Sequence, residues 1–128
     1  MDALTIKNII SRFREIQANV TLCQIIHAQC DNVDTNESMT ANANRQVLII
    51  QAWLQMLGEE ERFVIIKHLV DKLPWPMVVI EYERRWGIMQ SRHERTLKRI
   101  QVRALERIVC DCDRHCFTAE LSRIFECS

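Results

Sequence analysis

Glycine and proline are scarce in this chain, which has 128 residues but only two of each. A dinucleotide-binding fingerprint needs three spaced glycines, and a P-loop needs two glycines followed by Lys and Ser or Thr, so Gly58 and Gly87 can build neither motif. β-Sandwiches and barrels need many turns, which favour Gly, Pro and Asn. Apolar residues still make up 48% of the chain, enough to form a core. The composition therefore predicts a compact all-α protein.

Long hydrophobic runs are also missing. The apolar runs are far shorter than the roughly 18 residues that span a bilayer, and the N-terminus lacks the apolar segment and cleavage site of a signal peptide. We therefore expect a cytoplasmic protein that has no membrane partner. In that compartment its six cysteines are expected to be reduced thiols rather than disulfides.

Apolar residues near the N-terminus recur at alternating steps of three and four, which is a heptad stripe. The stripe predicts one long helix over residues 1–30, with its regular part from Leu4 to Cys30. This helix either packs along its own domain or forms the seam of a homodimer. The candidate seam residues are Ile6, Ile9, Phe13, Ile16 and Val20. Residues 31–44 are polar and Asn-rich, and they predict a linker.

Further helices are predicted on both sides of the two glycines. One runs from about residue 45 to Leu57, and Gly58 is expected to stop it, because glycine suits the left-handed position after a helix end. A second opens on Glu59–Glu61, whose carboxylates favour the positive end of the helix dipole, and it stops before Pro74. A short third helix ends at Gly87.

A longer helix follows over residues 91–108. Ser91 and Glu94 have the spacing of a capping box, so the helix is predicted to begin at or just after Ser91, with His93 as the alternative start. The apolar residues expected to face the core are Leu97, Ile100, Ala104 and Ile108.

The formal net charge of zero conceals an uneven distribution. Segment 84–107 has eight basic and two acidic residues, a charge of +6, whereas residues 1–83 carry −4 and residues 108–128 carry −2. Steps of three and four place a row of arginines on the outward side of the 91–108 helix: Arg92, Arg95, Arg99 and Arg103. Such a helix fits a DNA major groove, which is about 12 Å wide. The alternative is an ordinary solvated face, although such faces usually mix both signs of charge.

Residues 59–108 resemble region 4 of bacterial sigma factors, and more closely the phage late-gene regulators of the ArpU, RinA and antitermination Q type. The likeness lies in "EEERFVIIKHLVDK", a turn entering on "LPWPMVVI", then "RRWG" and "ERTLKRIQVRALERI". Trp75 matches the aromatic expected at the turn, and Ala104-Leu105 matches a small residue followed by an aliphatic. The usual cap of the family falls near His93, so the turn after Gly87 is about two residues longer than the pattern.

The resemblance implies a long N-terminal helix and a helical bundle whose segment 45–110 contains a helix-turn-helix. It implies a DNA-binding transcription regulator of phage or prophage type that reads double-stranded DNA with helix 91–108. Transcription antitermination, or binding to RNA polymerase or a sigma factor, is the alternative. The implied base contacts are Arg92, His93, Arg95, Thr96 and Arg99. The implied phosphate contacts are Lys98, Arg103, Arg84 and Arg85.

The segment 111–128 is Cys-rich and is predicted to hold a last short helix. Thiolates and imidazoles are zinc ligands, and four of them cluster here: Cys110, Cys112, His115 and Cys116. Their spacing is not that of a standard zinc finger, and cysteine also serves as a small buried apolar residue. We therefore expect no cofactor, with zinc as the alternative. We expect no enzyme either, because the chain has no recognisable nucleophile motif.

Overall fold

A computed structural model describes residues 2–29, 34–114 and 118–126 of the chain. Every element in these ranges is helical, which confirms the all-α prediction. The elements are α1 (Ala3–Ser11), α2 (Phe13–Gln29), α3 (Asp34–Met56), α4 (Glu59–Ile65), the π-helical turn η1 (Ile66–Val70), α5 (Trp75–Trp86), the 3₁₀ turn η2 (Ile88–Gln90), α6 (Glu94–Arg114) and α7 (Thr118–Glu126). No helix in this described part is both long and apolar enough to cross a membrane.

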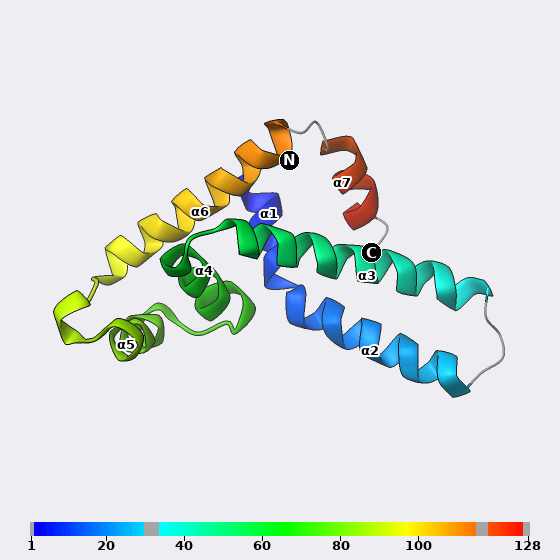
Figure 1. Cartoon of the computed structure of the whole chain (residues 1–128), viewed down its shortest axis with the longest axis horizontal. Helices are drawn as coiled ribbons and strands as arrows, with labels where there is room; N and C mark the ends of the chain where they lie inside the picture. The colour runs from blue at the N-terminus through cyan, green and yellow to red at the C-terminus, as the bar shows by residue number, and fades with distance from the viewer. Residues whose placement is uncertain (1, 30–33, 115–117, 127–128) are drawn as a thin grey trace.

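The predicted single N-terminal helix is interrupted at Arg12. The Arg12 amide donates to the Ile9 carbonyl at 3.1 Å, three residues back instead of four, and Arg12 itself has φ −94° and ψ 5°. Helical geometry resumes at Phe13. The break lets α1 pack on α6 while α2 runs beside α3 (Figure 1). One heptad stripe is therefore divided between two helices with different partners.

The predicted dimer seam lies mostly inside this chain. Four of its five residues are no more than 8% exposed and belong to one hydrophobic cluster: Ile6, Ile9, Phe13 and Ile16. Val20 is half-buried. Of the two predicted alternatives, packing along its own domain is correct for these four residues, and the dimer seam is wrong for them, because α3 and α6 of the same chain cover them.

The predicted linker at residues 31–44 is also wrong, because residues 34–44 form the first turns of α3. A side chain of this polar segment and one just after it bind α3 to α7: Asn42 Nδ2 and Gln46 Nε2 donate to the Ile124 carbonyl at 3.1 and 2.8 Å. Trp53 of α3 stacks on Phe125 of α7, with ring centroids 5.9 Å apart. These tertiary contacts offset the low helix propensity of Asn and Thr.

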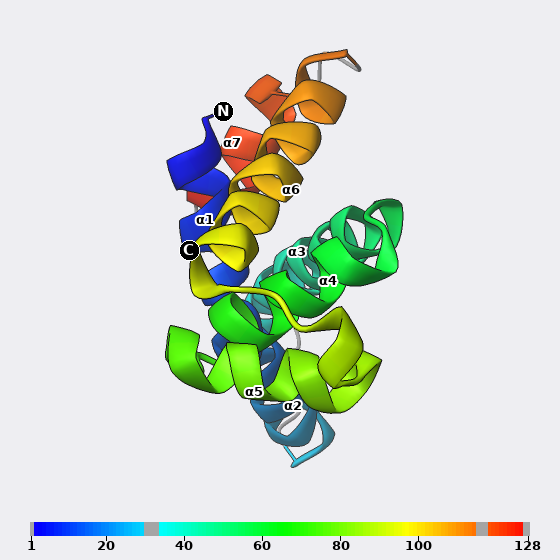
Figure 2. The ribbon, with the colours of Figure 1, turned by 90° about the vertical axis from the view of Figure 1, so that its left-hand side faces the viewer.

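The core consists of two clusters separated by α4. Adjacent residues of α4 face opposite ways, since Ile65 joins the main cluster of α1, α2, α3 and α6, whereas Val64 joins a smaller cluster. The smaller cluster contains Val78 and Tyr82 of α5 and Leu97 of α6. Figure 2, seen from the end that carries α5, shows α4 and α5 together beneath the rising α6. The smaller cluster therefore fixes α5 and the start of α6 to the rest of the molecule.

Gly58 departs from the prediction, whereas Gly87 agrees with it. Gly58 has φ −66° and ψ 166° and is the N-cap of α4, so it does not occupy a left-handed position. Arg62 instead caps the end of α3: its guanidinium donates to the carbonyls of Leu54, Gln55 and Leu57 at 2.8 to 3.1 Å. Gly87 has a φ of 92°, a value that favours glycine, and it marks the end of α5 as predicted.

Candidate nucleic-acid interface

The turn between α5 and α6 spans residues 87–93. The Ser91 backbone is extended, with ψ 139°, and the first α6 hydrogen bond runs from Leu97 N to the His93 carbonyl at 3.1 Å. Helix α6 therefore begins at Glu94, and the start at Ser91 with its capping box is wrong. The alternative at His93 is correct, because His93 directly precedes the helix and its carbonyl accepts the first helical hydrogen bond. The helix also continues to Arg114, past the predicted end near 108 and across the predicted boundary at 110/111.

The inner side of α6 agrees with the predicted stripe. Leu97, Ala104 and Ile108 are buried, and Ile100 is half-buried. The buried side is wider than predicted because it includes Gln101, Leu105 and Cys112. This burial fixes the rotation of α6, and the opposite side faces solvent.

The outer side of α6 carries Arg95, Arg99 and Arg103, all exposed. No carboxylate among the residues that the structure describes lies within ion-pair distance of these three guanidinium groups. Together with Glu106 they border an open groove of about 410 Å³ along the helix. Lys98 also borders the groove, but its ammonium lies 3.0 Å from the Glu94 carboxylate. The arginine row is therefore free to bind an anion.

Arg92 belongs to the turn and not to α6, which separates it from the predicted row. Its Nε lies 3.3 Å from Glu60 Oε1 and 3.4 Å from the Tyr82 hydroxyl, and that hydroxyl donates to Glu60 at 2.7 Å. The hydrogen bond with Tyr82 and the Glu60 charge raise the pKa of Arg92, while burial raises the pKa of Tyr82. This trio connects α4, α5 and the turn, so it holds Arg92 beside the start of α6.

The remaining predicted contacts lie around the same end of the molecule. Arg84 is exposed and pairs with Glu81 at 2.8 Å, and the Arg85 guanidinium lies 5.1 Å from the Trp86 ring centroid. His93 is exposed and Thr96 is half-buried. The structure thus places all nine predicted DNA-binding residues on the end of α5, the turn and the exposed part of α6.

A polar contact between η1 and α6 supports this surface from beneath. His68 Nδ1 donates to Gln101 Oε1 over 2.7 Å, and the His68 ring stacks on Trp75 with centroids 3.8 Å apart. Burial lowers the pKa of His68 below its usual value, although the bond to Gln101 acts in the opposite direction. His68 is therefore mostly neutral at neutral pH and serves as a hydrogen-bond donor to α6.

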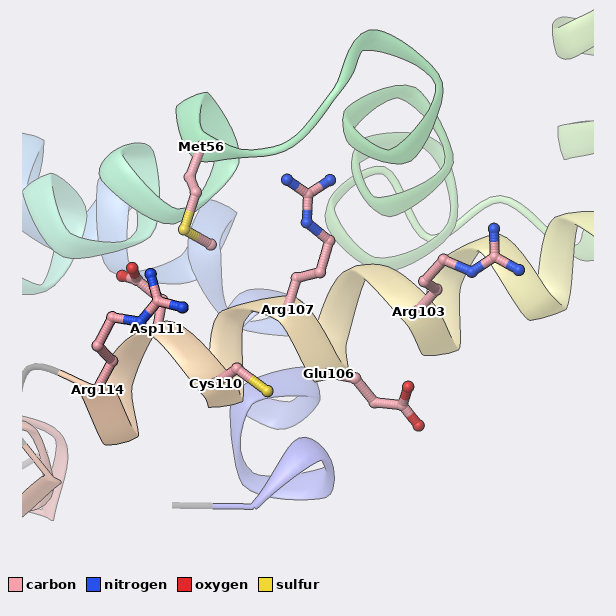
Figure 3. Close-up of a pocket in the computed structure, with 7 residues that line it drawn as sticks. All are labelled: Met56, Arg103, Glu106, Arg107, Cys110, Asp111 and Arg114. Carbon is pink, nitrogen blue, oxygen red and sulfur yellow. The ribbon is translucent and has the colours of Figure 1, made fainter.

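A second groove of about 510 Å³ lies where the end of α3 approaches α6 (Figure 3). Its charges are mixed: Arg103 and Arg114 face it together with Glu106 and Asp111, and Arg107 is held in an ion pair with Glu61. This groove therefore carries charges of both signs.

The predicted zinc ligands fall partly outside the described residues, since His115 and Cys116 are not described. Cys110 is exposed and Cys112 is buried in the main cluster, so their side chains lie on different sides of α6. Burial raises the pKa of the Cys112 thiol and favours its neutral form. Within the described ranges, no group of three His, Cys, Asp or Glu residues is placed to hold a metal ion.

Two parts of this surface had no signal in the sequence. Glu60 and Tyr82 are separated from Arg92 by 32 and 10 positions, and Gln101 lies 33 positions from His68. A polar residue such as Gln101, placed on an otherwise apolar helix side, indicates a buried partner but does not identify it. Comparison with known proteins adds no further assignment, because no family model, curated protein or solved structure matches the chain.

Proposed function

We propose that the chain binds double-stranded DNA, with α5, the turn at 87–93 and α6 acting as a helix-turn-helix. The observation that carries the proposal is the exposed row of Arg95, Arg99 and Arg103 on α6, which has no ion-pair partner among the described residues. Arginine binds phosphates and guanine edges through two parallel hydrogen bonds. The +6 charge of segment 84–107 would attract DNA despite the neutral total.

The spacing of the arginines suits a major groove. Arg95 and Arg103 are eight residues apart, so at 1.5 Å per residue the row extends about 12 Å along α6, and a helix about 10–12 Å across fits a groove about 12 Å wide. We therefore propose that Arg95 and Arg99 contact bases, together with Arg92, His93 and Thr96. Arg103 would reach phosphates at the groove edge, and Lys98, Arg84 and Arg85 would contact the backbone. Phosphate contacts would position the protein, and base contacts would select the sequence.

We further propose that DNA binding serves transcription regulation of the phage or prophage type. The support is the resemblance of residues 59–108 to sigma-factor region 4 and to phage late-gene regulators. One helix-turn-helix reads only a short half-site, so we propose that the protein acts as a homodimer on two half-sites.

The first test is binding of the purified chain to a random-sequence duplex, measured by fluorescence anisotropy at 50 and 200 mM salt. The four proposed phosphate contacts predict that affinity falls by about 100-fold between the two concentrations. Absence of binding at 50 mM salt would contradict the proposal. Enrichment from a random duplex library would then show whether one sequence is preferred over the others.

A second candidate function is binding to RNA polymerase or a sigma factor, as in an antitermination factor. It is favoured by exposed apolar side chains beside the arginines, since Ile88 and Met89 are 79% and 97% exposed. Purified polymerase holoenzyme is expected to bind the wild type, and Ile88→Ser with Met89→Ser should abolish that binding without changing DNA affinity. Failure of the wild type to bind polymerase would exclude this candidate.

A further inference from the structure

The outer face of α2 carries apolar side chains that the described part of the chain leaves exposed. Leu22, Ile25 and Ile26 are 55%, 51% and 41% exposed, and Ala18 beside them is also exposed. Steps of three and four residues place them on one side of the helix, which we call the α2 outer face (Ala18, Leu22, Ile25 and Ile26). Phe13 and Ile16 occupy the opposite side, which packs into the core. Helix α2 is therefore apolar on two sides, only one of which is buried.

The part of α2 that carries this face has no charged side chains. Residues 16–30 contain no Asp, Glu, Lys or Arg, and the only charged residues of α2 are Arg14 and Glu15 in its first turn. About a quarter to a third of an ordinary protein surface consists of charged residues, whereas the centres of protein interfaces are depleted of them. The α2 outer face thus has the composition of an interface centre.

We propose that a second copy of this chain packs its own α2 outer face against this one. A two-fold interface brings the same surface of both copies together, so that surface must be complementary to itself. An uncharged apolar stripe meets this condition, because pairing it with itself places no like charges opposite each other. The inference rests on the homodimer of the proposed function and gives that dimer a surface in place of the buried stripe of Ile6, Ile9, Phe13 and Ile16.

The position of α2 is compatible with DNA binding by both copies. The α2–α3 hairpin extends from one end of the molecule, whereas α5 and the start of α6 lie at the other end (Figure 1). Pairing through α2 therefore leaves Arg95, Arg99 and Arg103 exposed in each copy. A single helix of 17 residues is about 25 Å long and offers a narrow contact, so we expect a small interface with micromolar affinity.

The test is sedimentation equilibrium of the full chain without DNA, from 1 to 500 µM. The wild type is expected to show a monomer–dimer equilibrium. Leu22→Glu with Ile25→Glu should weaken dimerisation by at least tenfold, because it places four carboxylates in one small interface. The matched control is Leu48→Glu on α3, a residue that is 63% exposed and lies outside the α2 outer face, and it should leave dimerisation unchanged.

A mixing experiment separates loss of the interface from loss of the fold. Leu22→Glu with Ile25→Glu, mixed with Leu22→Lys with Ile25→Lys, should form a heterodimer although each variant alone is monomeric. A wild type that stays monomeric throughout, an equal effect of Leu48→Glu, or no heterodimer on mixing would each overturn the inference. A monomeric wild type that still binds DNA would overturn only this inference, and a dimer that binds no DNA would overturn only the proposed function.

Discussion

The two glycines provide a matched pair of alanine substitutions, because their backbones differ. Gly87 has φ 92° and ψ 163°, a region that is essentially restricted to glycine, yet an added Cβ would meet no atom within 4 Å. Gly58 has φ −66° and ψ 166°, which any residue adopts, and its Cβ would lie 3.5 Å from Glu61 Oε1, an ordinary contact. Any excess cost of Gly87→Ala would therefore come from backbone strain alone.

The expected free energies follow from these conformations. Backbone strain at Gly87 destabilises an alanine variant by about 1–3 kcal/mol. Alanine also lowers the conformational entropy of the unfolded chain, which stabilises the fold by about 0.4–1 kcal/mol, so Gly87→Ala should lower the free energy of unfolding by about 1–2 kcal/mol. At Gly58, alanine is a weaker N-cap than glycine, which costs up to about 1 kcal/mol. The lower entropy of the unfolded chain offsets this cost, so Gly58→Ala should leave the free energy of unfolding nearly unchanged.

Urea denaturation followed by circular dichroism measures both variants. Gly87→Ala should lower the midpoint while the slope of free energy against urea stays unchanged, and Gly58→Ala should reproduce the wild-type curve. Equal destabilisation by the two substitutions would refute the reasoning, since it would mean that the left-handed turn after α5 is not present in solution.

Three further predictions concern the packing beneath the arginine row. Leu97→Ala should destabilise the fold by about 3 kcal/mol in urea denaturation, because Leu97 is fully buried in the smaller cluster, whereas the exposed Val102→Ala on the same helix should cost less than about 0.5 kcal/mol. Similar costs for both would contradict the assigned rotation of α6. Tyr82→Phe should cost about 1 kcal/mol in the same assay, since it removes the hydroxyl that donates to Glu60, and an unchanged midpoint would argue against that bond. Burial lowers the pKa of His68 below 6.5, so the unfolded state binds its proton at higher pH than the folded state, and stability should fall as the pH drops below about 6.5. In thermal melts between pH 7 and 5, His68→Phe should lose less stability than the wild type as the pH falls. An equal loss of stability would mean that groups other than His68 cause the pH dependence.

The sequence predicted which N-terminal residues are buried but not what buries them. The heptad period of Ile6, Ile9, Phe13 and Ile16 requires an apolar partner surface, and a second copy or the rest of the chain would satisfy it equally. The break at Arg12 decides between them, because it directs α1 to α6 and α2 to α3. No glycine or proline marks this break, so local patterns could not reveal it.

Local propensity failed where tertiary contacts dominate. The Asn-rich start of α3 has the composition of a loop, yet it is helical and is joined to α7 through Asn42 and Gln46. The arginines of α6 were predictable, since Leu97, Ala104 and Ile108 determine which side of the helix faces outward. The ion pair that holds Arg92 in the turn was not predictable, because its partner Glu60 is 32 positions away in the sequence.

The central claim is that the exposed side of α6, and not the overall charge, binds DNA. The most direct test compares Arg95→Ala with Arg99→Ala against a control that makes the same change in net charge, Arg45→Ala with Arg123→Ala, at exposed sites on α3 and α7. Duplex affinity is measured by anisotropy across a salt series. The account predicts at least a tenfold loss of affinity for the preferred duplex in the α6 double variant, with little change in the salt slope because Arg95 and Arg99 are proposed to contact bases and not phosphates. It predicts wild-type behaviour for the control. Equal losses in the two double variants, or no loss in either, would contradict it.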